Sequence, residues 1–329
     1  MSLAICCEVR KNIGISRNCD RLKFKFEIYQ RNFKQPLRTS HGVWRIREGI
    51  IITLKNSAGV SSRGEIAPLP WFGSETLSEA LNFCQQLKEI NVEEIRAIPD
   101  SLPACQFAFE SAWLGLSASS SKDDFSDFNY CYLLPAGEKA LSAWQEITRH
   151  QPETTFKWKI GVYPLTTEIE ILKQLVDSFP ATVKLRLDAN GGLNLSQAEK
   201  LLRVTDTLDA IAFVEQPLKS DLLADMMQLA QAHNTLLALD ESVASYTQLQ
   251  TAYRRGWRGV YVIKAAIMGF PTRLKKFCRA DLDIVFSSVF ETEVGRRAVL
   301  KLARELNHPR AVGFGIESFY QSDDEKLIN

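Results

Sequence analysis

Short apolar segments alternate with helical patterns from residue 130 onwards, and this alternation sets narrow limits on the fold. There are eight such segments, at residues 130–134, 155–159, 182–188, 211–215, 236–240, 259–264, 283–287 and 311–314, and most end in a polar residue. The pattern is typical of parallel strands joined by crossover helices. Eight even units over about 200 residues favour a closed (β/α)8 barrel over an open doubly wound sheet.

The first 120 residues lack this alternation and predict a small antiparallel sheet. Residues 22–29 alternate apolar and charged side chains, and further strands are expected at 48–54 and 60–65, with a polar loop at 38–42. Helical patterns follow at 74–84 and 103–116. Residues 117–127 are rich in Ser and Asp and form the best candidate linker, so a separate N-terminal unit should precede the barrel.

Composition excludes several classes of function. The 329 residues include 40 Lys and Arg against 39 Asp and Glu, and a net charge of +1 creates no field that would attract nucleic acid or an anionic membrane surface. No run approaches the ~18 apolar residues of a membrane span, and the start of the chain is poorly organised for a secretion signal. Seven cysteines without a Cys-x-x-Cys pair indicate reduced thiols in a cytoplasmic protein.

Ionisable residues end five successive predicted strands. They are Lys159, Asp188, Glu215, Asp240 and Lys264, which are 29, 27, 25 and 24 residues apart, about one strand-plus-helix unit each. In a barrel, the C-terminal ends of neighbouring strands meet at one mouth, where their side chains converge on a pocket. Charges are also common where any strand gives way to a loop. Five in register favour a site in which two lysines flank three carboxylates.

Three converging carboxylates would repel one another without cations. Asp188, Glu215 and Asp240 offer only oxygen ligands, which suit a hard divalent ion, so Mg2+ is predicted ahead of Zn2+ or Cu2+. Water and a substrate carboxylate would complete the ~six-coordinate shell. A metal bound to a carboxylate stabilises the charge that develops when the neighbouring carbon loses a proton. The predicted reaction is therefore proton abstraction alpha to the carboxylate of a small molecule.

The base is predicted among the lysines. A lysine accepts a proton near pH 7 only if part of it is neutral, against a reference pKa of ~10.4. Lys157 and Lys159 share one strand face, so mutual repulsion and the metal would favour the loss of one proton. The alternative is a chance Lys-x-Lys on an exposed strand. Lys264, at the far side, could act on the opposite face of the substrate or stabilise charge there.

Five more residues are candidates for supporting the site or binding substrate. Arg186 lies on the face of the carboxylate two residues later and could bind a carboxylate or hold the metal ligands, or else pack at the surface. Asn190 and Glu241 come just after ligand positions and could hydrogen-bond the ligands or cap the next helix. Ser287 and Ser288 precede a helical stretch whose exposed amides could take a second carboxylate, although Ser is also a common N-cap.

The strand-end motifs together resemble those of the enolase superfamily, in its muconate-lactonizing subgroup. The motifs are Lys157-Trp-Lys159, Leu187-Asp-Ala-Asn190, Val214-Glu-Gln-Pro217, Leu239-Asp-Glu-Ser242 and Val262-Ile-Lys264. The resemblance covers the whole chain and implies an α/β fold with a (β/α)8-type barrel over 121–315. It also implies an N-terminal α+β capping domain over 1–120, with 1–18 as a possible disordered extension. A C-terminal segment over 316–329 would pack back on the capping domain.

Within the subgroup, the chain is most similar to the dehydratases of menaquinone and phylloquinone biosynthesis. Residues 38–42, 185–190 and 262–264 carry this similarity. It implies Mg2+-dependent syn elimination of water from 2-succinyl-6-hydroxy-2,4-cyclohexadiene-1-carboxylate, which yields an aromatic product. Lys159 would remove the alpha proton and assist the departure of hydroxide. Lys264 would stabilise the enediolate as a cation.

Other reactions of the superfamily stay open as alternatives: N-succinylamino acid racemisation, dipeptide epimerisation and cycloisomerisation. Dipeptide epimerases usually carry an Asp-x-Asp pair at the eighth strand end to hold the substrate's ammonium, whereas this chain has Gly313-Phe-Gly-Ile-Glu-Ser318. That difference counts against a substrate with an amino group. N-succinylamino acid racemisation is compatible with the same lysines. The sequence does not predict an oligomeric state.

Overall fold

A computed structural model describes residues 21–39, 42–117, 124–149, 154–278, 282–307, 309–316 and 319–320 of the chain. The predicted extension at 1–18, the centre of the predicted loop at 38–42, half of the predicted linker and most of the predicted C-terminal segment lie outside these ranges.

Eight parallel strands form the larger sheet. They are β5 (Tyr130–Leu134), β6 (Thr155–Lys159), β7 (Lys184–Asp188), β8 (Ile211–Glu215), β9 (Leu237–Leu239), β10 (Val260–Ile263), β11 (Ile284–Phe286) and β12 (Val312–Gly315). The order is β11-β10-β9-β8-β7-β6-β5-β12, and a parallel bridge between Ser287 and Gly313 joins the two ends. The sheet therefore closes into the predicted barrel.

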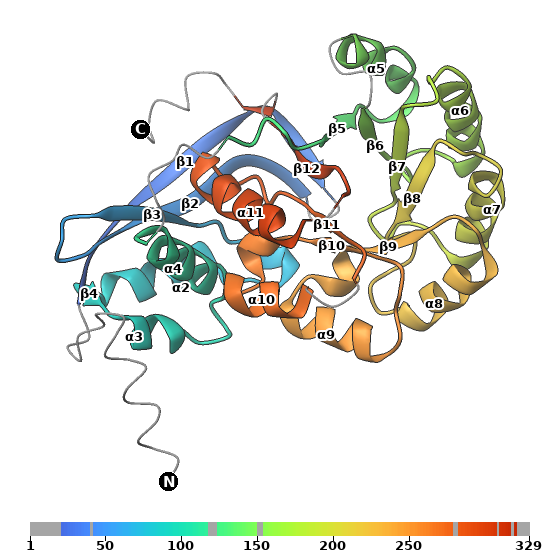
Figure 1. The fold of residues 1–329 in the computed structure, drawn as a ribbon. Coiled ribbons are helices and arrows are strands. Elements are labelled where there is room, and N and C mark those ends of the chain that lie inside the picture. Colours follow the sequence, from blue (N-terminus) through green and yellow to red (C-terminus); the bar gives the residue numbers. More distant parts are fainter. Residues whose placement is uncertain are drawn as a thin grey trace.

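Helices follow the barrel strands and ring the outside of the barrel (Figure 1). They are α5 (Ala140–Thr148), α6 (Leu165–Asp177), α7 (Leu195–Thr205), α8 (Leu223–Ala232), α9 (Tyr246–Arg254), α10 (Pro271–Cys278) and α11 (Glu293–Leu306). Helix α7 begins with a capping box between Asn194 and Gln197, and α9 with one between Ser245 and Gln248. Within the described residues, no helix is long and apolar enough to cross a membrane.

Burial explains why the barrel segments read as continuous apolar runs. All four residues of β10 are buried, as expected when helices cover one face of a parallel sheet and the barrel interior the other. A separate apolar cluster is formed by Phe213, Ala238, Val260, Val262 and Val285, which come from four neighbouring strands. The barrel is therefore a packed core with chemistry possible only at its ends.

The N-terminal sheet is antiparallel, in the order β3-β2-β1-β4. The part of the chain before the barrel contains these strands and the helices between and after them: β1 (Leu22–Thr39), β2 (Gly42–Lys55), β3 (Ser61–Ile66), η2 (Pro70–Phe72), α2 (Leu77–Gln85), β4 (Glu89–Ile90), α3 (Val92–Arg96) and α4 (Pro103–Gly115). The predicted sheet is confirmed, but β1 runs ten residues beyond the predicted 22–29. Its register shifts between Asn32 and Leu37, around Pro36, which has no N–H for the ladder. Because of this interruption, the alternation of apolar and charged residues does not continue into the second half of the strand, which was therefore not predicted.

The antiparallel sheet lies beside α11 (Figure 1). Glu65 of β3 accepts hydrogen bonds from the backbone N–H groups of Thr292 (2.8 Å) and Gly295 (2.8 Å), at the start of α11. Tyr29 of β1 donates to the same carboxylate (2.5 Å). Phe33 of β1 forms an antiparallel bridge with Tyr320. These contacts bring the sheet up to the end of the barrel where the strand-end side chains lie.

Candidate active site

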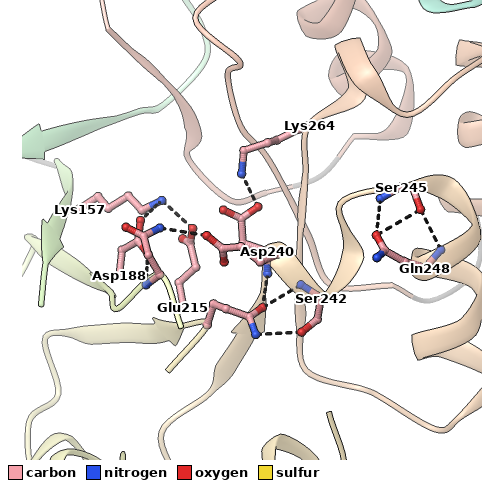
Figure 2. A network of polar contacts seen from close by, with 11 residues as sticks. Lys157, Asp188, Glu215, Asp240, Ser242, Ser245, Gln248 and Lys264 are labelled. Carbon is pink, nitrogen blue, oxygen red and sulfur yellow. Dashed lines mark hydrogen bonds and ion pairs between the residues drawn. The ribbon is translucent and has the colours of Figure 1, made fainter. Parts of the chain in front are cut away.

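The five strand-end residues come together at one end of the barrel. Lys159 pairs in register with Asp188, and Asp188 with Glu215, across β6, β7 and β8. Asp240 directly follows β9, and Lys264 directly follows β10. All five line one cavity of about 280 Å³. Figure 2 shows the three carboxylates side by side, with Lys157 at one end of the group and Lys264 at the other.

Aromatic side chains from outside the barrel strands cover this cavity. Its lining includes Trp44 of β2, Trp71 and Phe72 of η2, Phe290 and Phe319. The rings of Trp44 and Trp71 are 5.0 Å apart, those of Trp44 and Phe290 5.4 Å, and those of Phe290 and Phe319 5.9 Å. We call these five residues the aromatic roof. The cavity therefore has a charged floor and an apolar roof.

Sequence reasoning missed the aromatic roof. The tryptophans carry no periodic signal, and in the sequence they read as core or interface residues. The run Pro68-Leu-Pro-Trp-Phe-Gly73, a turn with two exposed-type aromatics, was the available hint. Only the packing of the N-terminal sheet on the barrel turns it into part of a site.

The Lys157 ammonium bridges two of the carboxylates. Its Nζ lies 2.8 Å from Asp188 Oδ2 and 2.6 Å from Glu215 Oε1. Burial by itself would lower the pKa of Lys157, but Asp188 and Glu215 outweigh it and raise the pKa well above its ordinary value. The two carboxylates therefore favour the charged form of Lys157, and its ammonium is committed to them.

The carboxylates respond differently to the same neighbourhood. Burial works against the ionised form of Asp188, but Lys157 holds its pKa below the usual range. Burial and the charge of Asp188 raise the pKa of Glu215 to about 8. The Lys157 ammonium therefore only partly offsets the mutual repulsion of the two buried carboxylates, which a further cation would relieve.

Lys264 is held at the opposite side of the carboxylates. Its ammonium is ion-paired with Asp240 and lies 4.1 Å from the centre of the Phe72 ring, a cation–π contact with the aromatic roof. The side chain is largely buried. This environment suits a lysine that acts as a fixed positive charge.

Lys159 has a different environment. It lines the cavity and is half-buried. Unlike Lys157 and Lys264, its side chain forms no hydrogen bond or ion pair with any residue in the described part of the chain. Its ammonium nitrogen is therefore available to a substrate in the cavity, while its positive charge helps to lower the pKa of Asp188.

The residues just after the ligand positions support the carboxylates. Asn190 donates through its backbone N–H to Asp188 (3.1 Å) and through its amide to Glu241 (3.1 Å). Asn190 and Glu241 do not cap the next helices, because Asn194 caps α7 and Ser245 caps α9. Burial and the Asp240 charge raise the pKa of Glu241 to about 7.

Gln216 is a supporting residue that the sequence reasoning passed over. Its Oε1 accepts hydrogen bonds from the backbone N–H groups of Asp240 (3.0 Å) and Ser242 (3.1 Å). Gln216 is buried and adopts φ 38°, in the left-handed region, as does Asn190 at φ 44°. Its position directly after Glu215 was the signal that would have found it.

The prediction for the start of α11 was partly wrong. Ser287 and Ser288 do line the cavity. The helix amides, however, are not open to a substrate carboxylate, because the backbone N–H groups of Thr292 and Gly295 already bind Glu65. Ser288 itself donates to Glu291 (2.7 Å). The sequence could not reveal Glu65 as the competing acceptor because it is more than 220 residues away.

Arg186 lines the cavity, but its guanidinium contacts other parts of the barrel. Its Nη2 donates to the backbone oxygen of Ala311 (2.7 Å), on the far side of the barrel, and its guanidinium lies 5.0 Å from the centre of the Phe213 ring. It is buried. The structure therefore places Arg186 as a brace across the barrel interior rather than at the surface.

The donor set fits a hard divalent cation. No three His, Cys, Asp or Glu side chains of the described ranges are grouped as they stand with the spacing of a metal site. Yet Asp188 Oδ2 and Glu215 Oε1 already share one cation, the Lys157 ammonium. Together with Asp240 they offer only oxygen ligands, the type that Mg2+ prefers. These three residues fit the ion by the chemistry of their oxygen atoms, and the raised pKa of Glu215 reflects a repulsion between them that a cation would relieve.

Comparisons with known proteins agree with this site. The sequence matches the family "Enolase C-terminal domain-like" over residues 139–316 and the family "MenC, N-terminal domain" over residues 28–116. An o-succinylbenzoate synthase of Thermosynechococcus vestitus is 39% identical over 90% of this chain and 93% of its own. One of Bacillus subtilis is 26% identical, over 83% of this chain and 79% of its own.

Solved structures show the same fold. The o-succinylbenzoate synthase from Thermosynechococcus elongatus BP-1, complexed with Mg in the active site, superposes with a TM-score of 0.86 at 37% identity, covering 93% of this chain and 99% of that one. The L-Ala-D/L-Glu epimerase of Bacillus subtilis has a TM-score of 0.77 at 19% identity, covering 92% of each chain, and shares the fold alone. From the matched families and the 39% identity across nearly both full lengths, the chain belongs to the o-succinylbenzoate synthase family of the enolase superfamily.

Proposed function

We propose that this chain is a Mg2+-dependent hydro-lyase that converts 2-succinyl-6-hydroxy-2,4-cyclohexadiene-1-carboxylate to 2-succinylbenzoate. The observation that carries the proposal is the order of charges at the barrel mouth: two lysines on β6 and after β10 flank three carboxylates from the strands between them. The relatives named for this activity span nearly the whole chain. The product is an intermediate for a quinone with an aromatic ring, so we place the chain in menaquinone or phylloquinone biosynthesis.

Lys159 is the proposed base. In its neutral form it takes the proton from the ring carbon next to the carboxylate, and the electron pair moves into the carboxyl group to form an enediolate. The ammonium of Lys159 then returns that proton to the departing hydroxyl on the same face, which leaves as water. As the water leaves, the electron pair of the enediolate moves back into the ring, which becomes aromatic. One side chain therefore serves as acid and as base.

Asp188, Glu215 and Asp240 are the proposed metal ligands, and Lys264 is the proposed cation opposite Lys159. When bound, Mg2+ supplies Lewis-acid stabilisation of the negative charge that develops on the substrate carboxylate. Lys264 adds a positive charge from the other side, fixed there by Asp240 and Phe72. Asn190, Gln216 and Glu241 keep the ligand-bearing loops in place.

We also propose a division of the chain into domains and roles for the other residues near the cavity. We assign Trp44, Trp71 and Phe72 of the aromatic roof to a capping domain over 1–120, Phe290 to the barrel over 121–315, and Phe319 to a C-terminal segment over 316–329. Arg186 braces the barrel, and Ser287 and Ser288 are candidates for substrate contact. The free cysteines of the described residues, Cys84, Cys105, Cys131 and Cys278, are all buried, which supports a cytoplasmic location.

N-succinylamino acid racemisation is the second candidate, because lysines approach the cavity from both sides. Racemisation would need Lys264 to exchange a proton with the substrate, whereas its ammonium is engaged by Asp240 and Phe72. The relatives named for dehydration also span nearly the whole chain, so we favour dehydration.

The direct test is a dehydration assay. Purified protein with Mg2+ and the cyclohexadiene substrate should convert it to the aromatic product, followed by absorbance, and chelation of the metal should stop the reaction. Absence of turnover with Mg2+ present rejects the proposal. Proton exchange into N-succinylamino acids in heavy water that outpaces dehydration would favour racemisation instead.

A further inference from the structure

A buried carboxylate outside the metal-ligand group holds the loop that leaves the base-bearing strand. Glu168 lies in the first turn of α6 and is fully buried. Its Oε2 accepts a hydrogen bond from the backbone N–H of Gly161 (2.7 Å). Its Oε1 accepts from the N–H groups of Val162 (2.9 Å) and Tyr163 (3.0 Å). Three consecutive amides therefore converge on one side chain.

The loop held by Glu168 begins directly after Lys159. On the strand side, Ile160 donates its backbone N–H to Asp188 O (2.9 Å), which continues the β6–β7 pairing by one residue. At Gly161 the chain turns away with φ 83°, in the left-handed region. Within the described residues, 161–163 pair with no strand. The Lys159 backbone is thus fixed by the sheet on one side and by Glu168 on the other.

The side chain of Lys159 has no such anchors of its own. Lys157 and Lys264 are oriented by ion pairs with carboxylates, but Lys159 has no hydrogen-bond or ion-pair partner among the described residues. Where its ammonium nitrogen lies in the cavity depends on its side-chain torsions and on the direction of its Cα–Cβ bond, which the backbone sets. A change in the path of residues 160–163 would therefore be transmitted to the Lys159 nitrogen.

We infer that Glu168 is a positioning residue for Lys159: by gathering the amides of residues 161–163, it sets the angle at which the lysine enters the cavity. This inference rests on the proposed role of Lys159 as the base. Proton transfer depends steeply on the distance between donor and acceptor atoms, and a misplacement of about 1 Å costs about 10²-fold in rate. Glu168 contributes to the chemical step without touching substrate.

The test compares Glu168→Gln with Glu170→Gln, measuring kcat, KM and the thermal unfolding midpoint of each. Glu170 lies on the same helix but is exposed, so its change removes the same charge without disturbing the loop. Gln at 168 keeps the shape, but its NH2 group would face backbone N–H donors. We expect kcat of Glu168→Gln to fall about 10²-fold with KM unchanged, and Glu170→Gln to match the wild type.

Gly161→Ala perturbs the same loop from its other end. An added Cβ would meet Leu193 at 3.6 Å and Ala189 O at 3.9 Å, which are ordinary contacts, so only the left-handed φ resists the change. It should lower kcat at unchanged KM as well. Combined with Glu168→Gln it should cost less than the product of the two single effects, because both act through one loop. If Glu168→Gln does not fold, this variant still carries the test.

Three results would overturn the inference. They are wild-type kcat in folded Glu168→Gln, wild-type kcat in Gly161→Ala, or a raised KM at unchanged kcat in either. The wild-type protein is assayed in parallel, since its failure to dehydrate the diene would reject the proposed function itself. Turnover by the wild type with an unaffected Glu168→Gln variant would reject only the positioning role.

Discussion

At the scale of single residues, the three lysines of the site differ in their partners. Lys157 and Lys264 are paired with buried carboxylates, so removing either leaves an unpaired charge inside the protein. Lys159 holds no such pair within the described ranges. Its removal should therefore affect chemistry without affecting folding, which separates the two kinds of role experimentally.

We predict that Lys159→Ala lowers kcat by at least about 10³-fold, because general acid–base catalysis by one group contributes 10²–10⁴-fold and Lys159 serves in both steps. The thermal unfolding midpoint should stay within experimental error of the wild type. Lys173→Ala, at an exposed position of α6, is the matched control. Unfolding of the Lys159 variant would instead assign the residue a structural role.

A pH effect on stability is expected from Glu291. Burial raises the pKa of Glu291 to about 7, against the hydrogen bond from Ser288, and the charge of Glu65 adds to the rise. The unfolded chain has a pKa of ~4.3 for this group. Between these values the folded state holds a proton that the unfolded state has lost, so the free energy of unfolding falls as pH rises and levels off above pH 7.

The Glu291→Gln variant should lack this loss. The stability of the wild type relative to the variant should therefore fall by about 3 kcal/mol between pH 4 and pH 8. Urea unfolding at several pH values measures the difference, with Glu170→Gln as the control for a lost surface charge. Parallel pH curves for wild type and Glu291→Gln would show that Glu291 does not titrate in this range.

At the scale of elements, Glu65 joins β3 to the start of α11. It accepts hydrogen bonds from the backbone N–H groups of Thr292 and Gly295, the hydroxyl of Thr292 (2.5 Å) and the hydroxyl of Tyr29. One buried carboxylate thus caps a helix of the barrel and ties two strands of the N-terminal sheet to it. Because α11 starts just after Phe290 of the aromatic roof, this junction also fixes part of the cavity wall.

We predict that Glu65→Gln lowers the free energy of unfolding by about 1–3 kcal/mol, the cost of leaving buried donors without an acceptor. Glutamine keeps one acceptor oxygen but brings an NH2 group against N–H and O–H donors. Glu93→Gln, at an exposed position of α3, controls for charge. Equal urea midpoints for the two variants would mean that the junction adds nothing to stability.

At the scale of the whole molecule, the carboxylates at the barrel mouth are a cost that folding imposes. In the unfolded chain Asp188, Glu215 and Asp240 are far apart, and the barrel brings them together in a buried place. A divalent cation that binds only the folded state should therefore stabilise the protein. At a Mg2+ concentration 100 times its Kd, the gain is about 2.7 kcal/mol.

This predicts that Mg2+ raises the thermal unfolding midpoint more than NaCl at equal ionic strength. Asp240→Asn should lose most of the rise, because it removes a ligand charge, while Lys159→Ala should keep it. A midpoint that responds to Mg2+ equally in the wild type and in Asp240→Asn would place the ion elsewhere.

Sequence reasoning located the barrel strands and the five strand-end residues because both follow from a local period. Segments 155–159 and 211–215 coincide with β6 and β8. It failed where an interruption broke the period, as at Pro36 within β1, and where a helix cap lay some residues further on, as with Asn194 and Ser245. The end of a strand and the residue that caps a helix both depend on the exact path of the neighbouring loop. The alternation of apolar and polar residues carries no information about that path.

The sequence by itself determined the fold class and the row of charges, because the end of each strand is set by the spacing of residues close along the chain. Tertiary structure alone decided which partners those charges have. Lys157 pairs with Asp188 and Glu215, Lys264 meets Phe72, and Glu65 takes the amides of α11. These contacts join residues between 31 and 230 positions apart, and no period along the chain carries information over such separations. They exist only once the sheet has packed on the barrel and burial has made each unpaired charge costly.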